Sequence, residues 1–129
     1  SLILSDIDHF KNVNDTYGHQ IGDLILKETA AVLKNNVRDI DVVGRYGGEE
    51  FIIMLPETPK ENALILADRL RKKIEDHVAT DQNGKEYKVT ISMGVSSFSG
   101  KETMEELIKL ADTALYKAKE SGRNRVCAS

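Results

Sequence analysis

Residues 88–95 alternate strictly between polar or small side chains and apolar ones, and the apolar ones are Val89, Ile91, Met93 and Val95. A period of two places successive side chains on opposite faces of a strand, so this segment predicts a β-strand with one buried face. Such a strand needs a sheet, and the apolar face of the sheet needs a covering layer. The chain is therefore expected to contain a central sheet with helices packed against it.

Other segments supply the remaining elements. Residues 2–4 and 51–55 are short apolar runs typical of buried central strands, and residues 42–43 predict a weaker strand. Residues 58–61 and 103–106 each have the sequence of a helix capping box, the first with Pro59 at the first helical position, and apolar residues follow at helical spacing. A third helix is expected over residues 21–33, and Gly122 is expected to end the last helix.

The predicted order is strand, helix, strand, strand, helix, strand, helix, with a last short strand at Val126. Gly47 and Gly48 lie between the second and third strands and predict a hairpin turn. The expected fold class is α+β, with a central, mainly antiparallel sheet flanked by helices. We expect one domain over residues 1–129, because chains of about 100 to 200 residues usually form one core.

Composition narrows the function classes. The 18 basic and 21 acidic residues give a net charge of −3, which argues against a protein held on nucleic acid by phosphate neutralisation. The longest apolar run, residues 51–55, is far shorter than the roughly 20 residues that cross a bilayer, so no membrane segment is expected. The single cysteine, Cys127, and the lack of a signal-peptide pattern lead us to expect a cytoplasmic location.

Acidic pairs stand at the end of the first predicted strand and at the hairpin. Asp6 and Asp8 share a face if the strand continues to Asp8. Glu49 and Glu50 follow two glycines, which permit positive φ and the close approach of a ligand. If the hairpin and the first strand are neighbours, Glu49 meets Asp6, and such oxygen ligands suit Mg²⁺ shared with substrate phosphates. Solvated acids at a strand end and a turn are the alternative interpretation.

The glycines and cations elsewhere allow two interpretations by themselves. Gly18 and Gly22 either direct backbone N–H groups at phosphates or ease entry into the following helix. No Walker sequence occurs, which excludes a P-loop. Lys119 and Arg123, near the end of the last predicted helix, are typical of a solvated pair that compensates the helix dipole.

A series of short motifs occurs in order along nearly the whole chain: DIDHFK at 6–11, ND at 14–15, GH at 18–19, GD at 22–23, RYGGEEF at 45–51, ADTALYKAK at 111–119 and GRN at 122–124. Together they resemble the GGDEF family of diguanylate cyclases, with Glu49 in place of the aspartate of the family's name, a variant found in active members. The resemblance implies a nucleotidyl-cyclase-like βααββαβ core.

The resemblance also implies an activity: two GTP molecules, one on each of two facing domains, are joined into cyclic di-GMP with release of two pyrophosphates. It implies a homodimer, two Mg²⁺ ions per active site with Mn²⁺ as the alternative ion, and a sensor or receiver domain in the parent protein. Relative to the family, the chain is expected to lack the helix that precedes the first strand.

The same resemblance assigns roles to individual residues. Asp6, Glu49 and the backbone carbonyl of Ile7 would bind the metal. Glu50 would assist at the metal or at the attacking hydroxyl, and Lys11 would stabilise the transferring phosphate. The GTP-binding residues would be Phe10, Asn14, His19, Asp23, Gly47, Gly48, Lys119 and Arg123.

Within that set, Asn14 and Asp23 would recognise guanine, because a carboxylate accepts from the N1–H and 2-amino groups that adenine lacks. Lys119 and Arg123 would hold the β- and γ-phosphates, in place of the solvated pair considered above. Gly47 and Gly48 would let the hairpin backbone approach the base or ribose.

Arg38 and Asp41 fit the family's RxxD inhibitory motif, with residues 42–46 between Asp41 and Gly47. The arginine would clamp the cyclic product, the aspartate would bind a guanine edge, and Arg69 would supply a second arm. A solvated charged loop is the alternative. Two other functions compete: a catalytically inactive cyclic di-GMP receptor, which the intact Asp6 and Glu49 disfavour, and a cyclase making a single-nucleotide product, which the GGEEF and RxxD motifs disfavour.

Overall fold

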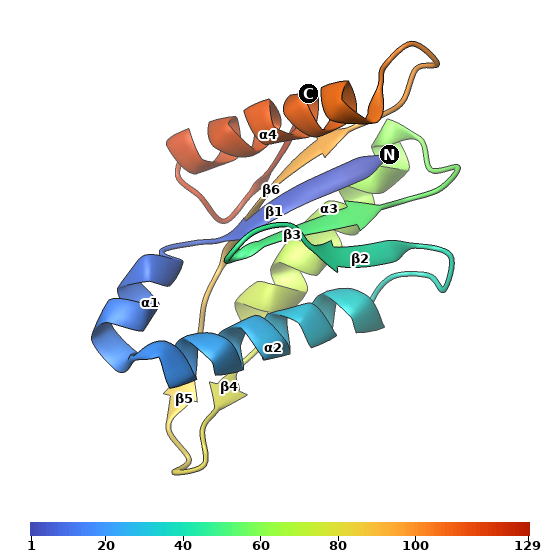
Figure 1. The fold of residues 1–129 in the computed structure, drawn as a ribbon. Helices are drawn as coiled ribbons and strands as arrows, with labels where there is room; N and C mark the ends of the chain where they lie inside the picture. The colour runs from blue at the N-terminus through green and yellow to red at the C-terminus, as the bar shows by residue number, and fades with distance from the viewer.

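The apolar run at the start of the chain forms the central strand of a five-stranded sheet (Figure 1). The structure is a computed structural model that describes residues 1–129. The strands lie in the order β2-β3-β1-β6-β7, with bounds β1 (Leu2–Ile7), β2 (Val42–Arg45), β3 (Glu50–Met54), β6 (Ile91–Ser96) and β7 (Val126–Ala128). All neighbours are antiparallel except β6 and β7. The predicted α+β class, the hairpin and the last short strand are confirmed.

Of the two predicted capping boxes, one is present at a helix start and the other is not. The helices are α1 (Phe10–Tyr17), α2 (His19–Asn35), α3 (Lys60–Asp76) and α4 (Met104–Glu120). The predicted capping box of α4 is present, because Thr103 Oγ1 accepts from the Glu106 N–H and the Glu106 carboxylate accepts from the Thr103 N–H. The predicted box of α3 is wrong: Pro59 is the N-cap, and the Thr58 hydroxyl donates to the Pro56 carbonyl instead. No helix is both long and apolar enough to span a membrane.

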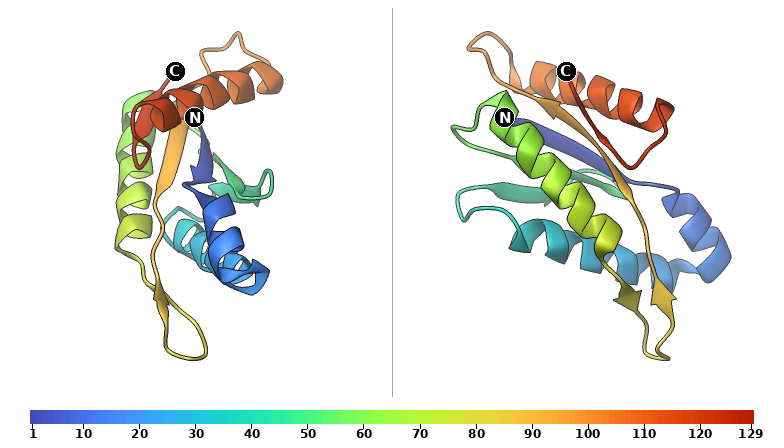
Figure 2. Two further views of the ribbon diagram at one scale, coloured as in Figure 1. Left: turned by 90° about the vertical axis from the view of Figure 1, so that its left-hand side faces the viewer. Right: turned by 180° about the vertical axis from the view of Figure 1, so that it is seen from behind.

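The region after β1 holds two helices where the apolar pattern predicted one. Gly18 separates them with a φ of 90°, a conformation that glycine adopts readily. Phe10 is the only buried residue of α1, so this short helix contributes little to the core. The βααββαβ order implied by the resemblance is present. The structure adds a small hairpin, β4 (Ala79–Thr80) with β5 (Glu86–Tyr87), which projects away from the two termini (Figure 2).

Strand β6 is buried on both faces, whereas its alternation predicted one buried face. All residues from Ile91 to Ser96 are buried. The apolar side chains of β6 join a core shared with α2 and α3. Two of the intervening small residues pack against α4: Ser96 Oγ donates to the Leu107 carbonyl, and a Cβ on Gly94 would lie 2.1 Å from the Ala111 carbonyl oxygen. Small residues on this face therefore mark close helix packing, not exposure to solvent.

Candidate functional site

The C-terminal end of β1 lies beside the β2–β3 turn, which is the condition under which the sequence predicts that Glu49 and Asp6 lie close together. Asp6 is paired with Glu50 across the β1–β3 ladder, and the Ile7 N–H donates to the Glu49 carbonyl oxygen at 3.2 Å. Asp6, Ile7 and Glu49 line one cavity of about 180 Å³, which we call the strand-end cavity. The topology thus brings together residues that lie far apart in the sequence.

Asp8 also lines the strand-end cavity, but its carboxylate is bound within the protein and not free as that of a ligand-binding residue would be. Strand β1 ends at Ile7, so the period of two that would align the carboxylates does not extend to Asp8. The Asp8 carboxylate is buried and accepts hydrogen bonds from Thr90 Oγ1 at 2.7 Å, Ser92 Oγ at 2.6 Å and the Asn124 N–H at 3.0 Å. Its acceptor capacity is used inside the protein, which makes it a structural residue.

Basic side chains face the acids of the strand-end cavity. Lys119, in the last turn of α4, donates from Nζ to Asp6 Oδ2 at 2.5 Å. Arg123, just beyond α4, and Lys11, from α1, line the same cavity. Lys119 is therefore more than a solvated residue at a helix end, whereas Arg123 is exposed at the edge of the cavity. Mixed charges of this kind can meet an anionic ligand and a cation together.

The donor set fits a hard divalent cation that is shared with a ligand. Asp6 and Glu49 offer carboxylates and Ile7 offers a carbonyl, while no group of three or more His, Cys, Asp and Glu side chains gathers as a metal cluster. Mg²⁺ is commonly held by one or two carboxylates, with substrate phosphates and water completing its shell. Beside these residues, burial and then the charge of Asp6 raise the pKa of Glu50 above its ordinary value.

A second cavity, of about 490 Å³, adjoins the strand-end cavity and shares Phe10, Lys11 and Glu49 with it. We call it the helix cavity, because most of its lining residues come from α1 and α2. Its other lining residues are Asn14, His19, Asp23, Leu26, Arg45 and Gly48. Every residue predicted to bind GTP lines one of the two cavities, with the exception of Gly47.

Gly22 shapes the helix cavity, which the sequence interpretation missed. A Cβ at Gly22 would lie 1.9 Å from Asn14 Oδ1 and 3.3 Å from Phe10 Cζ. The residue lies inside α2, one turn from its start, so neither of the two roles considered from the sequence describes it. Glycine lowers the stability of a helix when it lies in the helix interior. Its presence at such a position was the available sign that another residue approaches closely there. Gly22 leaves room for the Asn14 side chain.

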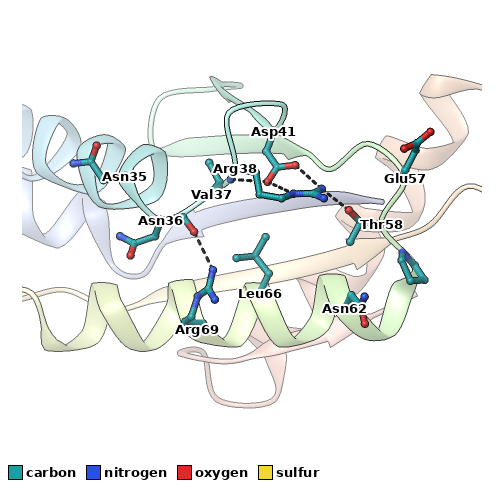
Figure 3. Close-up of a pocket in the computed structure, with 11 residues that line it drawn as sticks. Asn35, Asn36, Val37, Arg38, Asp41, Glu57, Thr58, Asn62, Leu66 and Arg69 are labelled. Atoms are coloured by element: carbon teal, nitrogen blue, oxygen red, sulfur yellow. Dashed lines mark hydrogen bonds and ion pairs between the residues drawn. The ribbon is translucent and has the colours of Figure 1, made fainter.

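A third cavity, of about 520 Å³, holds the RxxD residues near the start of β2 (Figure 3). Arg38 donates from Nη2 to Asp41 Oδ1 at 2.8 Å and from Nε to Asp41 Oδ2 at 3.1 Å, and Nη2 also donates to Thr58 Oγ1 at 2.7 Å. Arg69 of α3 lines the same cavity and donates to the Asn36 carbonyl at 3.1 Å. The three residues proposed for an inhibitory site therefore lie together; we call this the RxxD cavity.

Asp41 is the buried member of that cluster. Burial raises its pKa, but the hydrogen bonds and the positive charge of Arg38 outweigh burial and hold the pKa below its ordinary value. The bidentate geometry is that of a strong arginine–carboxylate pair. This pair is a structured unit, which argues against the alternative of a solvated loop.

The sequence model described as "Diguanylate cyclase, GGDEF domain" matches residues 1–125. The chain belongs to the GGDEF family. Diguanylate cyclase A of Treponema denticola is 47% identical over 130 residues, which are 100% of this chain and 35% of that protein. The chain thus spans about a third of the length of this relative.

Solved GGDEF domains share the fold. The GGDEF domain of DgcB from Caulobacter crescentus, crystallised in complex with c-di-GMP, superposes with a TM-score of 0.93 at 32% identity, covering 98% of this chain and 75% of that one. The active GGEEF domain of a diguanylate cyclase from Vibrio cholerae gives a TM-score of 0.88 at 38% identity, covering 98% of this chain and 80% of that one.

In this GGDEF domain the naming motif forms a tight turn held by its own backbone. The N–H groups of Tyr46 and Gly47 donate to the Glu50 carbonyl at 2.8 and 3.3 Å. Arg45, which the sequence interpretation did not single out, donates to the Gly48 carbonyl at 2.7 Å. Neither Gly47 nor Gly48 adopts the positive φ that glycine permits. A Cβ at Gly47 would lie 2.7 Å from Glu50 Oε1, so a side chain there would displace the Glu50 carboxylate.

Proposed function

We propose that this GGDEF domain is a diguanylate cyclase, which condenses two GTP molecules into cyclic di-GMP with Mg²⁺ as its metal. The observation that carries the proposal is the junction of two cavities with different chemistry. Amide and carboxylate groups line the helix cavity, whereas the strand-end cavity combines metal-binding oxygens with cations. A guanine and its triphosphate need these two environments next to each other.

Guanine would lie in the helix cavity. Asp23 accepts from the N1–H and the 2-amino group of the base, and Asn14 offers an amide donor and an acceptor to the same ring. Adenine lacks that donor pair and would leave the Asp23 carboxylate unpaired, which disfavours ATP. Phe10 and His19 line the cavity beside the base.

The triphosphate would lie in the strand-end cavity. Lys119 and Arg123 hold the terminal phosphates, and Lys11 approaches the phosphate that is transferred. Asp6, Glu49 and the Ile7 carbonyl hold Mg²⁺, with Glu50 as a further carboxylate directly opposite Asp6. When bound, the metal supplies neutralisation of the charge that develops on the reacting phosphate.

The reaction needs two copies of the domain. The ribose 3′-hydroxyl of one GTP attacks the α-phosphorus of the other; a new phosphorus–oxygen bond forms, the bond to the β-phosphate oxygen breaks, pyrophosphate leaves and the hydroxyl loses its proton. The second GTP reacts in the same way and closes the ring. The domain's contribution is to hold each nucleotide in line with its partner.

Product inhibition is part of the proposal. Arg38 and Arg69 would grip the phosphates and guanine bases of cyclic di-GMP in the RxxD cavity, and Asp41 would accept from a guanine edge. Strand β2 begins directly after Asp41 and leads to the GGEEF turn, which gives this cavity a short path to the site of reaction.

Mass spectrometry of the reaction product tests the proposal. The domain is incubated with GTP and Mg²⁺ over a series of protein concentrations, because turnover depends on pairing of two copies. We expect cyclic di-GMP, with a rate per domain that rises with concentration, and no product from Asp6→Asn. A cyclic mononucleotide as the only product, or binding of cyclic di-GMP without turnover at any concentration, would overturn it.

A further inference from the structure

The turn that follows α4 has an unusual backbone. Gly122, Arg123 and Asn124 have φ values of 126°, 61° and 46°. Residues with a side chain rarely adopt this left-handed conformation, and where they do, surrounding contacts must hold them in it. Arg123 is one of the two cations that line the strand-end cavity from this end of α4. The contacts that hold the turn therefore determine the backbone position from which the Arg123 side chain extends.

The backbone of the turn is fixed from two directions. The Arg123 N–H donates to the Ala118 carbonyl at 2.9 Å, which ties the turn to the end of α4. The Asn124 N–H donates to Asp8 Oδ2 at 3.0 Å. Asp8 is buried and is itself held by two hydroxyl groups near the start of β6. The turn is thereby anchored to the sheet.

The side chain of Asn124 is held by α3. Its Nδ2 donates to Glu75 Oε2 at 2.5 Å, and its Oδ1 accepts from Arg71 Nη1 at 2.9 Å. Glu75 Oε1 lies 3.7 Å from Arg71 Nη1 and 3.1 Å from Lys72 Nζ. The hydrogen bond from Asn124 and then that from Lys72 lower the pKa of Glu75, so the acceptor is ionised at neutral pH.

We propose that Asn124 is a positioning residue, which Glu75 and Arg71 of α3 hold so that Arg123 presents its guanidinium to the terminal phosphates of GTP. The inference rests on the proposed function, because it concerns how the triphosphate is bound. Neither Glu75 nor Arg71 lines the strand-end cavity. Their effect on the ligand must therefore pass through Asn124 and the residue before it.

A pair of substitutions can exchange donor and acceptor at this contact. Asn124→Asp keeps the shape and still accepts from Arg71, but it places a second carboxylate against Glu75, so the contact becomes repulsive. Adding Glu75→Gln restores an amide opposite a carboxylate, with the donor now on α3. The matched control is Asp76→Asn, which removes a neighbouring acid of α3 that is paired with Lys72 and not with the turn.

The readout separates triphosphate binding from base binding. Affinities for GTP with a methylene group between the α- and β-phosphates, and for GMP, are measured in Mg²⁺ by NMR chemical-shift titration. We expect Asn124→Asp to lose about tenfold in affinity for the triphosphate, the size of one charge-assisted hydrogen bond, and to keep its affinity for GMP. Glu75→Gln with Asn124→Asp should recover the loss, and Asp76→Asn should match the wild type.

A merely structural role would weaken both ligands together or neither. An unchanged ratio of the two affinities in Asn124→Asp, or no recovery in the double variant, overturns the inference. Should Asn124→Asp not fold, Arg71→Gln, which weakens the same contact without adding charge to the turn, must show the same selective loss. If the wild type itself binds no triphosphate analogue, the proposed function fails as well, which is a different result from an unchanged ratio.

Discussion

The ammonium group of Lys119 lies 2.5 Å from Asp6 Oδ2 and joins the last turn of α4 to the end of β1. The side chain of Asp6 is 12% exposed and that of Lys119 is 32% exposed, so the pair is partly shielded from water. One carboxylate therefore serves both the lysine and the metal proposed at this cavity. A bound metal would compete with the ammonium group for it.

Lys119→Met tests this competition. The substitution keeps most of the apolar stem of the side chain and removes its charge, so Asp6 becomes available to a metal without displacement of the ammonium. We expect Mg²⁺ alone to bind several-fold more tightly, and a triphosphate analogue to bind about tenfold more weakly because a phosphate contact is lost. Isothermal titration calorimetry measures both. Lys117→Met, an exposed neighbour in the same turn of α4, is the control and should change neither affinity.

Gly22→Ala should impair recognition of guanine although it favours the helix locally. The new methyl group would overlap Asn14 Oδ1, which lies 1.9 Å from the position of the Cβ, so the Asn14 side chain must move out of the helix cavity. We expect affinity for GMP to fall about tenfold, close to the loss of one good hydrogen bond.

A double-mutant cycle shows whether Gly22 acts through Asn14. In an Asn14→Ala background the oxygen that causes the overlap is gone, so Gly22→Ala should add no further loss of affinity. Equal losses from Gly22→Ala in both backgrounds would contradict this account.

The sequence predicted the sheet well, because its strands carry period-two or continuous apolar patterns that hold regardless of their neighbours. It could not predict that hydrogen bonds within the protein occupy the Asp8 carboxylate, since they come from hydroxyl groups more than 80 positions later in the chain. Gly22 and Gly94 were missed for a related reason. What they allow is a close approach of other residues, and such an approach leaves no pattern in the local sequence.

The candidate site residues were identified mainly from their resemblance to family motifs, and less from their own chemistry and spacing. Taken alone, Lys119 and Arg123 are typical of a solvated helix end. Only the resemblance to the family assigned them to phosphate binding. The structure shows how Lys119 reaches the strand-end cavity, because α4 packs across β6 and places its last turn at the end of β1.

Arg38→Ala should relieve inhibition by the product. The Arg38 guanidinium is the exposed member of the Arg38–Asp41 pair and lines the RxxD cavity, where it would clamp the phosphates of cyclic di-GMP. We expect the cyclic di-GMP concentration that halves the initial rate to rise about tenfold or more, as a bidentate charged contact is lost. Initial-rate assays with added product measure it. Lys34→Ala, a cation outside this cavity, should leave the inhibition constant unchanged, and an unchanged constant in Arg38→Ala would refute the inhibitory site.

Asp41 should give the fold a pH-dependent contribution to stability. Because its pKa is lower in the folded protein than in the unfolded chain, the ionised form favours folding. The contribution is complete above the unfolded value, about 3.9, and is lost as the pH falls through the lower folded value.

Comparison with Asp41→Asn isolates this contribution, because the other carboxyl groups are common to both proteins. Urea unfolding of the wild type and the variant should give a difference in unfolding free energy that is constant between about pH 5 and 7 and shrinks below about pH 4. A difference that stays constant to the lowest pH at which both proteins fold would show that the Arg38–Asp41 charge pair does not stabilise the fold.

Gly94→Ala should be among the most destabilising single substitutions in the sheet. A Cβ at this position would lie 2.1 Å from the Ala111 carbonyl oxygen and 2.3 Å from the Leu115 nitrogen. Both atoms belong to the backbone of α4, so no side-chain rotation can relieve the overlap and the helix must shift as a body. Overpacking of a core costs about 1 to 3 kcal/mol, and a clash with backbone belongs at the upper end.

The matched control is Gly44→Ala in β2, where the nearest atom to a new Cβ would be Ile52 Cγ2 at an ordinary 3.5 Å. Urea unfolding should show a loss of about 3 kcal/mol for Gly94→Ala and little change for Gly44→Ala. Because α4 carries Lys119, a shifted helix should also weaken triphosphate binding in whatever Gly94→Ala protein remains folded. Equal stability of the two variants would mean that α4 is not seated on β6 at Gly94, and the account of how Lys119 reaches Asp6 would fail with it.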